Sequence, residues 1–319
     1  MIGLRLAEPR SEGKTLSQWL VNQDPDFLWI PNDLYGHIHD ELWYKLIEDP
    51  PTTTASQQFQ PESPEPQKYR AIRALGTNAL PTFLNWLVAK PSVWDRRRAW
   101  VAGRLPRAWG ERIYPGTSGL PPSARLRIAA LEGFEILGTN AVPALPVLSN
   151  ILFNVDSDLP VAWSIAQTGP PGIALLAEAV SSGTPAIRDR AALVLGLEAA
   201  SSAIPALVSA VERGVLSYHV LGALGRMGCE DPRLTAALMR QVNSTNELTG
   251  FRMEVLLLGL QGERARSAIP ALIRRYRECS DPAALSDRKL FRRIIRRLDP
   301  DAERQLPPSP TDETDDTWP

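Results

Sequence analysis

The stretch NAVPALPVL, residues 140–148, carries a pattern of small and apolar residues that returns along the chain at a nearly constant interval. Counted from Ala141, equivalent positions lie 62 residues earlier and 31, 62, 93 and 127 residues later, at Ala79, Gly172, Ala203, Leu234 and Ala268. The leucine of the pattern recurs in step with it, at Leu145, Leu176, Leu207, Leu238 and Leu272. Six positions in one register indicate an internal repeat of about 31 residues.

The recurring residues described above form one sequence ladder, and a second ladder of recurring residues lies just upstream of it in the same register. Residues 129–131 read Ala-Ala-Leu, residues 191–193 read the same, and residues 222–224 read Gly-Ala-Leu. Alanine and leucine are strong helix formers. The apolar residues of SARLRIAALEGFEILG, residues 123–138, also follow the spacing of one helix face. These segments are predicted to form the first helix of each repeat.

The residues that follow this helix predict a turn and a second helix. Gly138 can take the left-handed conformation that ends a helix. Asn140 can cap the next helix, and Pro143 suits its first turn. Each repeat is therefore expected to consist of a helix, a glycine-containing turn and a second helix.

One pair of helices cannot cover its own apolar side, whereas stacked pairs bury that side against the next pair. The recurrent leucines are expected to fill the space between layers, and the small residues of the first helices to allow close approach. An ordinary helical bundle is the alternative, but it gives no reason for proline and leucine to recur at a fixed interval. The predicted fold is all-α, an α-solenoid of stacked antiparallel helix pairs.

The repeats resemble a known family. ALGTNALP (74–81), ILGTNAVPALPVL (136–148) and IRDRAALVLGLEAASSAIPALV (187–208) are similar to HEAT or HEAT-like repeats of the short bacterial type. The family places Asp-Arg before an Ala-Ala-x-x-Leu-Gly helix, which matches residues 189–196. The unit between Asp156 and Gly183 departs from it, because Pro160 stands where alanine is expected and predicts a late or kinked first helix.

Four regions are predicted along the chain. Residues 1–48 form an N-terminal helical segment, with helices over TLSQWLVNQ and NDLYGHIHDELWYKLIED, and residues 49–66 form an exposed linker rich in Pro, Ser, Thr and Gln. Residues 67–300 form the HEAT-like solenoid, with an insertion at about 91–122 that includes a helix over WDRRRAWVAGRL. Residues 301–319 form an acidic, disordered tail.

The composition is that of a soluble globular protein, with 319 residues, 44% hydrophobic residues and a net charge of -1. No run of about 18 apolar residues occurs, which predicts no transmembrane segment. The expectation is a monomeric, cytoplasmic bacterial protein. EGKTLSQWL also resembles the segment that precedes HEAT repeats in some bacterial proteins with an N-terminal membrane anchor, so an anchor upstream of this start remains an alternative.

Few residues have the pattern of a catalytic, cofactor or metal site. Gly13–Thr15 lacks the upstream glycine and the preceding strand of a phosphate-binding loop, so a capped helix start is expected there. His37 and His39 would point away from each other on a helix, and His219 is expected to pack or to be partly exposed. Cys229 is expected to be a small filler or an exposed thiol, Cys279 is expected to end a helix, and neither has a histidine close in sequence. No catalytic, cofactor or metal residue is predicted.

Basic residues, most of them arginines, are unusually frequent near the end of the repeats. Nine cations crowd into one stretch: Arg274, Arg275, Arg277, Arg288, Lys289, Arg292, Arg293, Arg296 and Arg297. In DRKLFRRIIRRL, residues 287–298, the apolar residues form one helix face and the paired cations form the other. This face is either the solvated outer side of the last helix or a binding face for nucleic-acid phosphate, an acidic partner or an anionic membrane. The acidic tail is hypothesised to fold back and mask it.

Aromatic residues and arginines also gather in the predicted insertion. Trp94, Arg97, Trp100 and Trp109 are of the types enriched at interface hot spots. The alternative, which the sequence favours, is a local plug that seals one end of the solenoid with the indoles in its core.

The sequence therefore predicts a non-enzymatic scaffold that binds a protein or peptide partner on the solenoid surface. The alternative is a nucleic-acid or polyanion binder with arginine-rich faces, related in fold to HEAT-like DNA glycosylases. The resemblance to HEAT-like lyases that attach bilins extends to the repeat alone.

Overall fold

The computed structural model describes residues 8–21, 67–90, 93–94, 97, 101, 104, 122–154, 159–244, 252–278 and 285–307. These residues are almost entirely helical, which confirms the prediction of an all-α protein. The chain divides into two compact units, and the first passes to the second between Glu198 and Ala199. The helix predicted over residues 32–49, the linker at 49–66 and most of the insertion at 91–122 lie outside the described residues.

A short β-hairpin precedes the first helix. Strands β1 (Arg10–Ser11) and β2 (Lys14–Thr15) pair antiparallel, and Gly13 takes a φ of 77° in the turn between them. Helix α1 (Leu16–Leu20) then starts at Thr15, whose side chain accepts a hydrogen bond from the Gln18 amide while its own amide donates to the Gln18 side chain. The predicted capped helix start is confirmed. The expectation that no strand precedes Gly13 is wrong, because two residues suffice for this hairpin.

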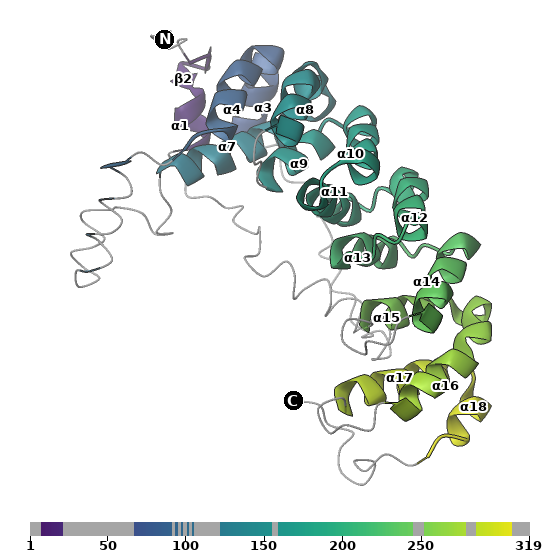
Figure 1. The fold of residues 1–319 in the computed structure, drawn as a ribbon. Helices are drawn as coiled ribbons and strands as arrows, with labels where there is room; N and C mark the ends of the chain where they lie inside the picture. Colours follow the sequence, from purple (N-terminus) through teal and green to yellow (C-terminus); the bar gives the residue numbers. More distant parts are fainter. Residues whose placement is uncertain are drawn as a thin grey trace. The chain divides into compact units, whose positions relative to one another are not determined.

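The first unit continues with seven α-helices and two 3-10 turns in its described residues. They are α3 (Gln67–Leu75), η1 (Gly76–Ala79), α4 (Leu80–Leu87), α7 (Pro122–Leu137), η2 (Gly138–Ala144), α8 (Leu145–Asn154), α9 (Leu159–Ala166), α10 (Pro170–Ser182) and α11 (Pro185–Leu197). Helix α7 packs against α3, α4 and α9, and α9 packs in turn against α8, α10 and α11 (Figure 1). Pro160 lies in the first turn of the short helix α9, as its position in the sequence predicts.

Two glycines of this unit allow neighbouring helices to touch. A Cβ atom at Gly133 of α7 would overlap the ring of Phe83 in α4, and a Cβ at Gly172 of α10 would overlap the Ile165 carbonyl at the end of α9. Phe83 is buried, and its ring centroid lies 5.9 Å from that of Phe134. Glycine replaces the alanine of the ladder at residue 172 because the two helices approach too closely for a side chain.

The second unit has the following elements: η3 (Ser201–Ala203), α12 (Ile204–Glu212), α13 (Tyr218–Arg226), α14 (Pro232–Ser244), α15 (Arg252–Leu260), η4 (Gly262–Ala268), α16 (Ile269–Glu278), α17 (Leu285–Leu298) and α18 (Pro300–Arg304). Helices α13, α15 and α17 pack in succession, and so do α12, α14 and α16. The two rows are joined by the pairs α12–α13, α14–α15 and α16–α17. Each helix of this unit therefore meets the equivalent helix of the next pair.

The residues of both sequence ladders form the core. The buried leucines of the pattern are Leu176, Leu207, Leu238 and Leu272, each with a relative exposure of 0%. The expectation is wrong for Leu145, which is only half-buried. The expected cap at Asn140 is also wrong. Residues Gly138–Ala144 form a 3-10 turn without a side-chain cap, so α8 starts only at Leu145, and Pro143 lies before it.

The turn inside each helix pair contains a backbone conformation that glycine favours. One positive φ angle occurs in each of these successive turns: Gly76 (54°), Gly138 (53°), Gly169 (81°), Ala199 (48°), Gly228 (60°) and Gly262 (57°). The predicted left-handed end of the helix at Gly138 is confirmed. Ala199 is the exception in this series, since its Cβ makes the left-handed conformation unfavourable.

One stretch among the described residues, Arg125–Asn154, is long and apolar enough to cross a membrane. It is not one straight α-helix, because α7 ends at Leu137 and Gly138 takes a φ of 53° before the 3-10 turn. Ala130, Phe134 and Leu148 are among its buried side chains.

The substitution Ala199→Gly should stabilise the protein. Ala199 is exposed and has a φ of 48°, and a left-handed L-residue costs about 1–2 kcal/mol. Its replacement by glycine should therefore raise the free energy of unfolding by about 0.5–1 kcal/mol, after the greater freedom of glycine in the unfolded chain is counted. Urea unfolding followed by circular dichroism measures the change.

The matched control is Gly138→Ala, which introduces the same conflict where no atom lies within 4 Å of the new Cβ. It should lower the free energy of unfolding by about 1 kcal/mol. Equal stabilities of all three proteins would contradict the account of the turn.

Candidate interaction surface

Helix α17 separates apolar and cationic residues on two faces, as its sequence predicts. Its buried face consists of Leu290, Phe291, Ile294, Ile295 and Leu298. On the other side, Lys289, Arg293 and Arg297 are exposed and follow one another at a spacing of four residues. Residues four apart lie in one row along a helix, so these three side chains form a cationic row, the name used below.

Arg275 is not part of an exposed surface. Its relative exposure is 6%, and its guanidinium donates from Nε and Nη2 to the Val242 carbonyl at 3.3 and 3.2 Å. Its Nη1 lies 2.9 Å from a Glu278 carboxylate oxygen. This buried side chain joins α16 to the end of α14. The prediction that Arg275 binds an external anion is therefore wrong. Its neighbours Arg274 and Arg277 are exposed.

Arg288 also contacts the protein itself. Its guanidinium lies 4.6 Å from the ring centroid of Tyr276, a cation–π distance. The hydroxyl of the buried Tyr276 donates a hydrogen bond of 2.9 Å to the Pro307 carbonyl. Arg288, α16 and the chain after α18 are thereby connected around one aromatic ring.

Arg292 and Arg296 hold a carboxylate that follows them in the chain. Nε of Arg292 lies 2.6 Å from Oε1 of Glu303, and Nη2 of Arg296 lies 3.1 Å from the same oxygen. Glu303 is mostly buried, with 12% of its side chain exposed. The hydrogen bond from Arg292 lowers the pKa of Glu303 below its ordinary value of 4.5, with Arg296 contributing further. Together with Arg275, which contacts Glu278, at least three of the nine predicted cations are therefore already bound to a carboxylate.

The first residues of the predicted disordered tail are ordered. Asp299 caps α18 by accepting hydrogen bonds from the amides of Asp301 and Ala302, and Pro300 occupies the first turn. Leu306 is buried. The prediction that the disordered tail begins at residue 301 is therefore wrong, because the structure describes the chain as far as Pro307. Residues 308–319 lie outside the described residues.

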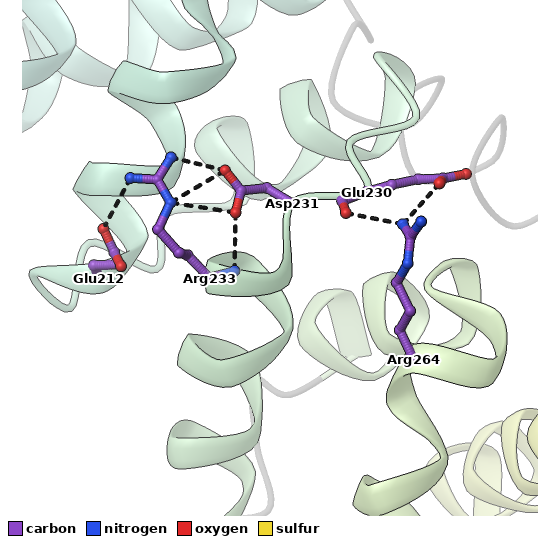
Figure 2. Close-up of polar contacts among 5 residues, drawn as sticks. All are labelled: Glu212, Glu230, Asp231, Arg233 and Arg264. Atoms are coloured by element: carbon purple, nitrogen blue, oxygen red, sulfur yellow. Dashed lines mark hydrogen bonds and ion pairs between the residues drawn. The ribbon is translucent and has the colours of Figure 1, made fainter.

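A second charged cluster lies at the turns of the second unit, and Figure 2 shows it. Asp231 accepts hydrogen bonds from the guanidinium of Arg233 at 2.7 to 3.2 Å and from its amide at 2.9 Å, which lowers the pKa of Asp231. Nη1 of Arg233 also lies 4.0 Å from the Glu212 carboxylate. Arg264 donates to the carbonyl and to the carboxylate of Glu230 at 2.9 and 2.7 Å. These groups connect α12, the turn before α14 and η4.

Two buried polar side chains stabilise the same turns. Gln261 donates to the Cys229 carbonyl at 2.7 Å, and the Thr235 hydroxyl donates to the Gln261 side-chain oxygen at 3.2 Å. Cys229 is buried, and burial raises the pKa of its thiol. Cys229 was predicted to be either a small side chain that fills the core or an exposed thiol, and its burial agrees with the first alternative. Cys279 lies outside the described residues.

Of the other residues considered in the sequence analysis, some lie within the described residues and some outside them. His219 is buried, and its ring packs edge-on against Tyr218 at 5.8 Å. His37, His39, Trp100 and Trp109 lie outside the described residues. Within the described ranges no group of three or more His, Cys, Asp or Glu side chains could hold a metal ion.

Trp94 does not fill a core. Its relative exposure is 68%, and the Arg97 guanidinium lies 5.6 Å from its ring centroid. The expectation of an indole plug is therefore wrong for Trp94, and the role of Trp94 and Arg97 in an interface stays a prediction.

Sequence reasoning missed one buried acid. Glu254 of α15 is only 5% exposed, and desolvation raises the pKa of its carboxyl group. The available signal was its position in RMEVLLLGL, where an acidic residue interrupts an apolar helix. Among the described residues, Oε2 of Glu254 has no hydrogen-bond partner.

Comparisons of the chain with protein-family models, with curated protein sequences and with solved structures find no match.

Replacement of Arg275 by methionine should destabilise the protein, because the Val242 carbonyl loses a charged donor in a buried position. Hydrogen bonds to charged groups contribute about 1.5–3 kcal/mol, so a loss of about 2 kcal/mol in the free energy of unfolding is expected. Arg277→Met is the matched control, since Arg277 is exposed on the same helix, and it should change stability by less than about 0.5 kcal/mol. Chemical unfolding gives both values, and equal losses would refute the structural role of Arg275.

The contact between Glu303 and Arg292 should stabilise the protein in a pH-dependent way. Because the pKa of Glu303 is lowered in the folded state, its contribution is complete above the unfolded value near 4.5 and disappears as the pH falls through the folded value. The melting temperature of the unmodified chain should exceed that of Glu303→Gln at about pH 6, and the difference should shrink towards about pH 3. A difference that stays constant over this range would contradict the ion pair.

Proposed function

We propose that the chain is a HEAT-like α-solenoid that acts as a non-enzymatic scaffold for a protein or peptide partner. The single observation that carries this proposal is a set of side-chain hydrogen bonds whose partners are one sequence repeat apart. The pairs are Gln167–Glu198, Cys229–Gln261, Glu230–Arg264, Val242–Arg275 and Arg266–Leu298, with separations of 31 to 34 residues.

These bonds support a stacked array because each one joins a helix pair to its successor. Four of the five pairs lie in the second unit, where equivalent helices also pack in succession. The positive φ angle that returns in the turn of each pair adds independent support. The resemblance of the sequence to HEAT repeats is consistent with both observations.

A scaffold function follows from the way in which such arrays bury their residues. Contacts between neighbouring pairs use the inner faces of the helices, so the outer faces remain available over the length of the array. Exposed apolar side chains on such a surface can anchor a partner. Val88 and Val147 of the first unit, both nearly half exposed, are examples of side chains that a partner could cover.

Polyanion binding is a second candidate function, favoured by the exposure of the cationic row Lys289, Arg293 and Arg297. It has less support than the nine cations suggest in the sequence, because Arg275, Arg288, Arg292 and Arg296 contact groups of the protein itself. It ranks below the scaffold for that reason.

The dependence of binding on salt distinguishes the two functions. A partner is isolated with the full chain from its own cells, purified, and titrated against the chain in parallel with a labelled DNA duplex. A scaffold interface should keep its affinity for the protein partner within about tenfold between 50 and 200 mM salt, whereas contacts with six to ten phosphates lose about 10³–10⁵ in affinity over that range.

The matched variant is Lys289→Glu/Arg293→Glu/Arg297→Glu, which reverses the cationic row and leaves the buried Arg275 and the Arg292–Glu303 contact intact. The scaffold proposal predicts unchanged affinity for the protein partner. Tight, steeply salt-dependent DNA binding that this variant abolishes, together with no protein partner at the higher salt concentration, would replace it with the second candidate.

A further inference from the structure

The chain returns along α17 after that helix ends. Glu303 lies against Arg292 and Arg296 in the second half of α17. Further on, the Pro307 carbonyl accepts the hydrogen bond from Tyr276, whose ring lies under Arg288 near the start of α17. The described chain therefore runs antiparallel to α17 and leaves it beside its first turns.

The residues on the two sides of Pro307 carry opposite charges. Residues 269–307 contain ten basic and six acidic residues, a net charge of +4, whereas residues 308–319 contain four acidic and no basic residues, a net charge of -4. The four acids are Asp312, Glu313, Asp315 and Asp316. Charge complementarity of this kind lowers the energy of an encounter between the two segments.

We propose that the cationic row of α17, Lys289, Arg293 and Arg297, binds the acidic segment 312–316 of the same chain. The contact of Glu303 with Arg292 and Arg296 is the first carboxylate–guanidinium contact of this kind, and the acidic segment adds further ones on the exposed side of the same helix. This inference does not depend on the scaffold function.

The chain length permits the contact. Asp312 and Asp316 follow Pro307 by five and nine residues, which span at most about 17 and 30 Å. The distance along α17 from Lys289 to Arg297 is about 12 Å at the helical rise. Every member of the cationic row is thus within reach of an acidic side chain from the point at which the described chain ends.

The covalent link favours this occupant over an external anion. A segment tethered by a few residues has an effective concentration of the order of millimolar. A nucleic acid or an acidic partner must therefore displace the tethered segment before it can use the cationic row. The acidic segment would raise the specificity of the surface, because weakly binding anions fail to compete.

A carbodiimide cross-link tests the contact in the full chain. The reagent joins a carboxylate to an amine at contact distance, and Lys289 is the only lysine in the sequence after residue 90. Mass spectrometry of the monomeric product should find Lys289 linked to residues 312–316 at low salt, with a yield that falls several-fold at about 0.5 M salt because the attraction is screened. The ion pair between Lys68 and Glu132 provides the internal positive control.

Absence of this cross-link in a sample that contains the Lys68–Glu132 product would overturn the proposal. A link found only between two chains, recognised from a mixture of isotope-labelled and unlabelled protein, would overturn it too, in favour of binding by a second copy. Lys289→Arg, which keeps the charge and removes the amine, must abolish the product if the assignment is right.

Neutralisation of the acids gives an independent measurement. The variant Asp312→Asn/Glu313→Gln/Asp315→Asn/Asp316→Asn should bind a heparin oligosaccharide at least threefold more tightly than the unmodified chain, because the cationic row no longer has a tethered competitor. In the background of Lys289→Glu/Arg293→Glu/Arg297→Glu this gain should disappear. Unchanged heparin affinity on neutralisation would overturn the proposal, while binding of a protein partner at another surface would be unaffected by either result.

Discussion

The last carbonyl groups of an α-helix have no donor within that helix, and in this protein arginines from the neighbouring repeat supply one. Arg73 of α3 donates to the Ile136 carbonyl near the end of α7, and Arg266 donates to the carbonyl of Leu298, the last residue of α17. Arg275 does the same for Val242 near the end of α14. A guanidinium is suited to this position because it brings positive charge to the negative end of the helix and several donors in a fixed geometry.

This constraint explains part of the arginine content that the sequence presents as a surface feature. Arg275 could have been recognised from its spacing, since it follows the buried Leu272 by three residues and therefore lies on the inner side of α16. Its charge suggested an exposed position, whereas the unsatisfied carbonyl of the adjacent helix determines a buried one. The cationic row is different, because the spacing of Lys289, Arg293 and Arg297 opposite an apolar face does predict its exposure.

Periodicity predicted the helical class and most of the core, because buried small and large residues must recur wherever helix pairs pack alike. It did not predict where the second helix of a pair begins. The 3-10 turn Gly138–Ala144 delays the start of α8 to Leu145, and this leucine is half-buried whereas the equivalent leucines are buried. Helix α18 had a local signal in Asp299-Pro300, a cap followed by proline at the first helical position. The acidic composition of the following residues obscured it.

The packing of α4 against α7 has a consequence for the sequence that connects them. The partners Arg73 and Ile136 are 63 residues apart, about twice the separation of the other cross-repeat bonds, because the sequence between α4 and α7 is longer by about one repeat. Nevertheless Gly133 and Phe134 of α7 meet Phe83 of α4 directly. Proximity in the sequence and proximity in space are therefore separate here: the direct contacts hold α4 and α7 together as neighbours although the sequence between them is about one repeat longer than elsewhere.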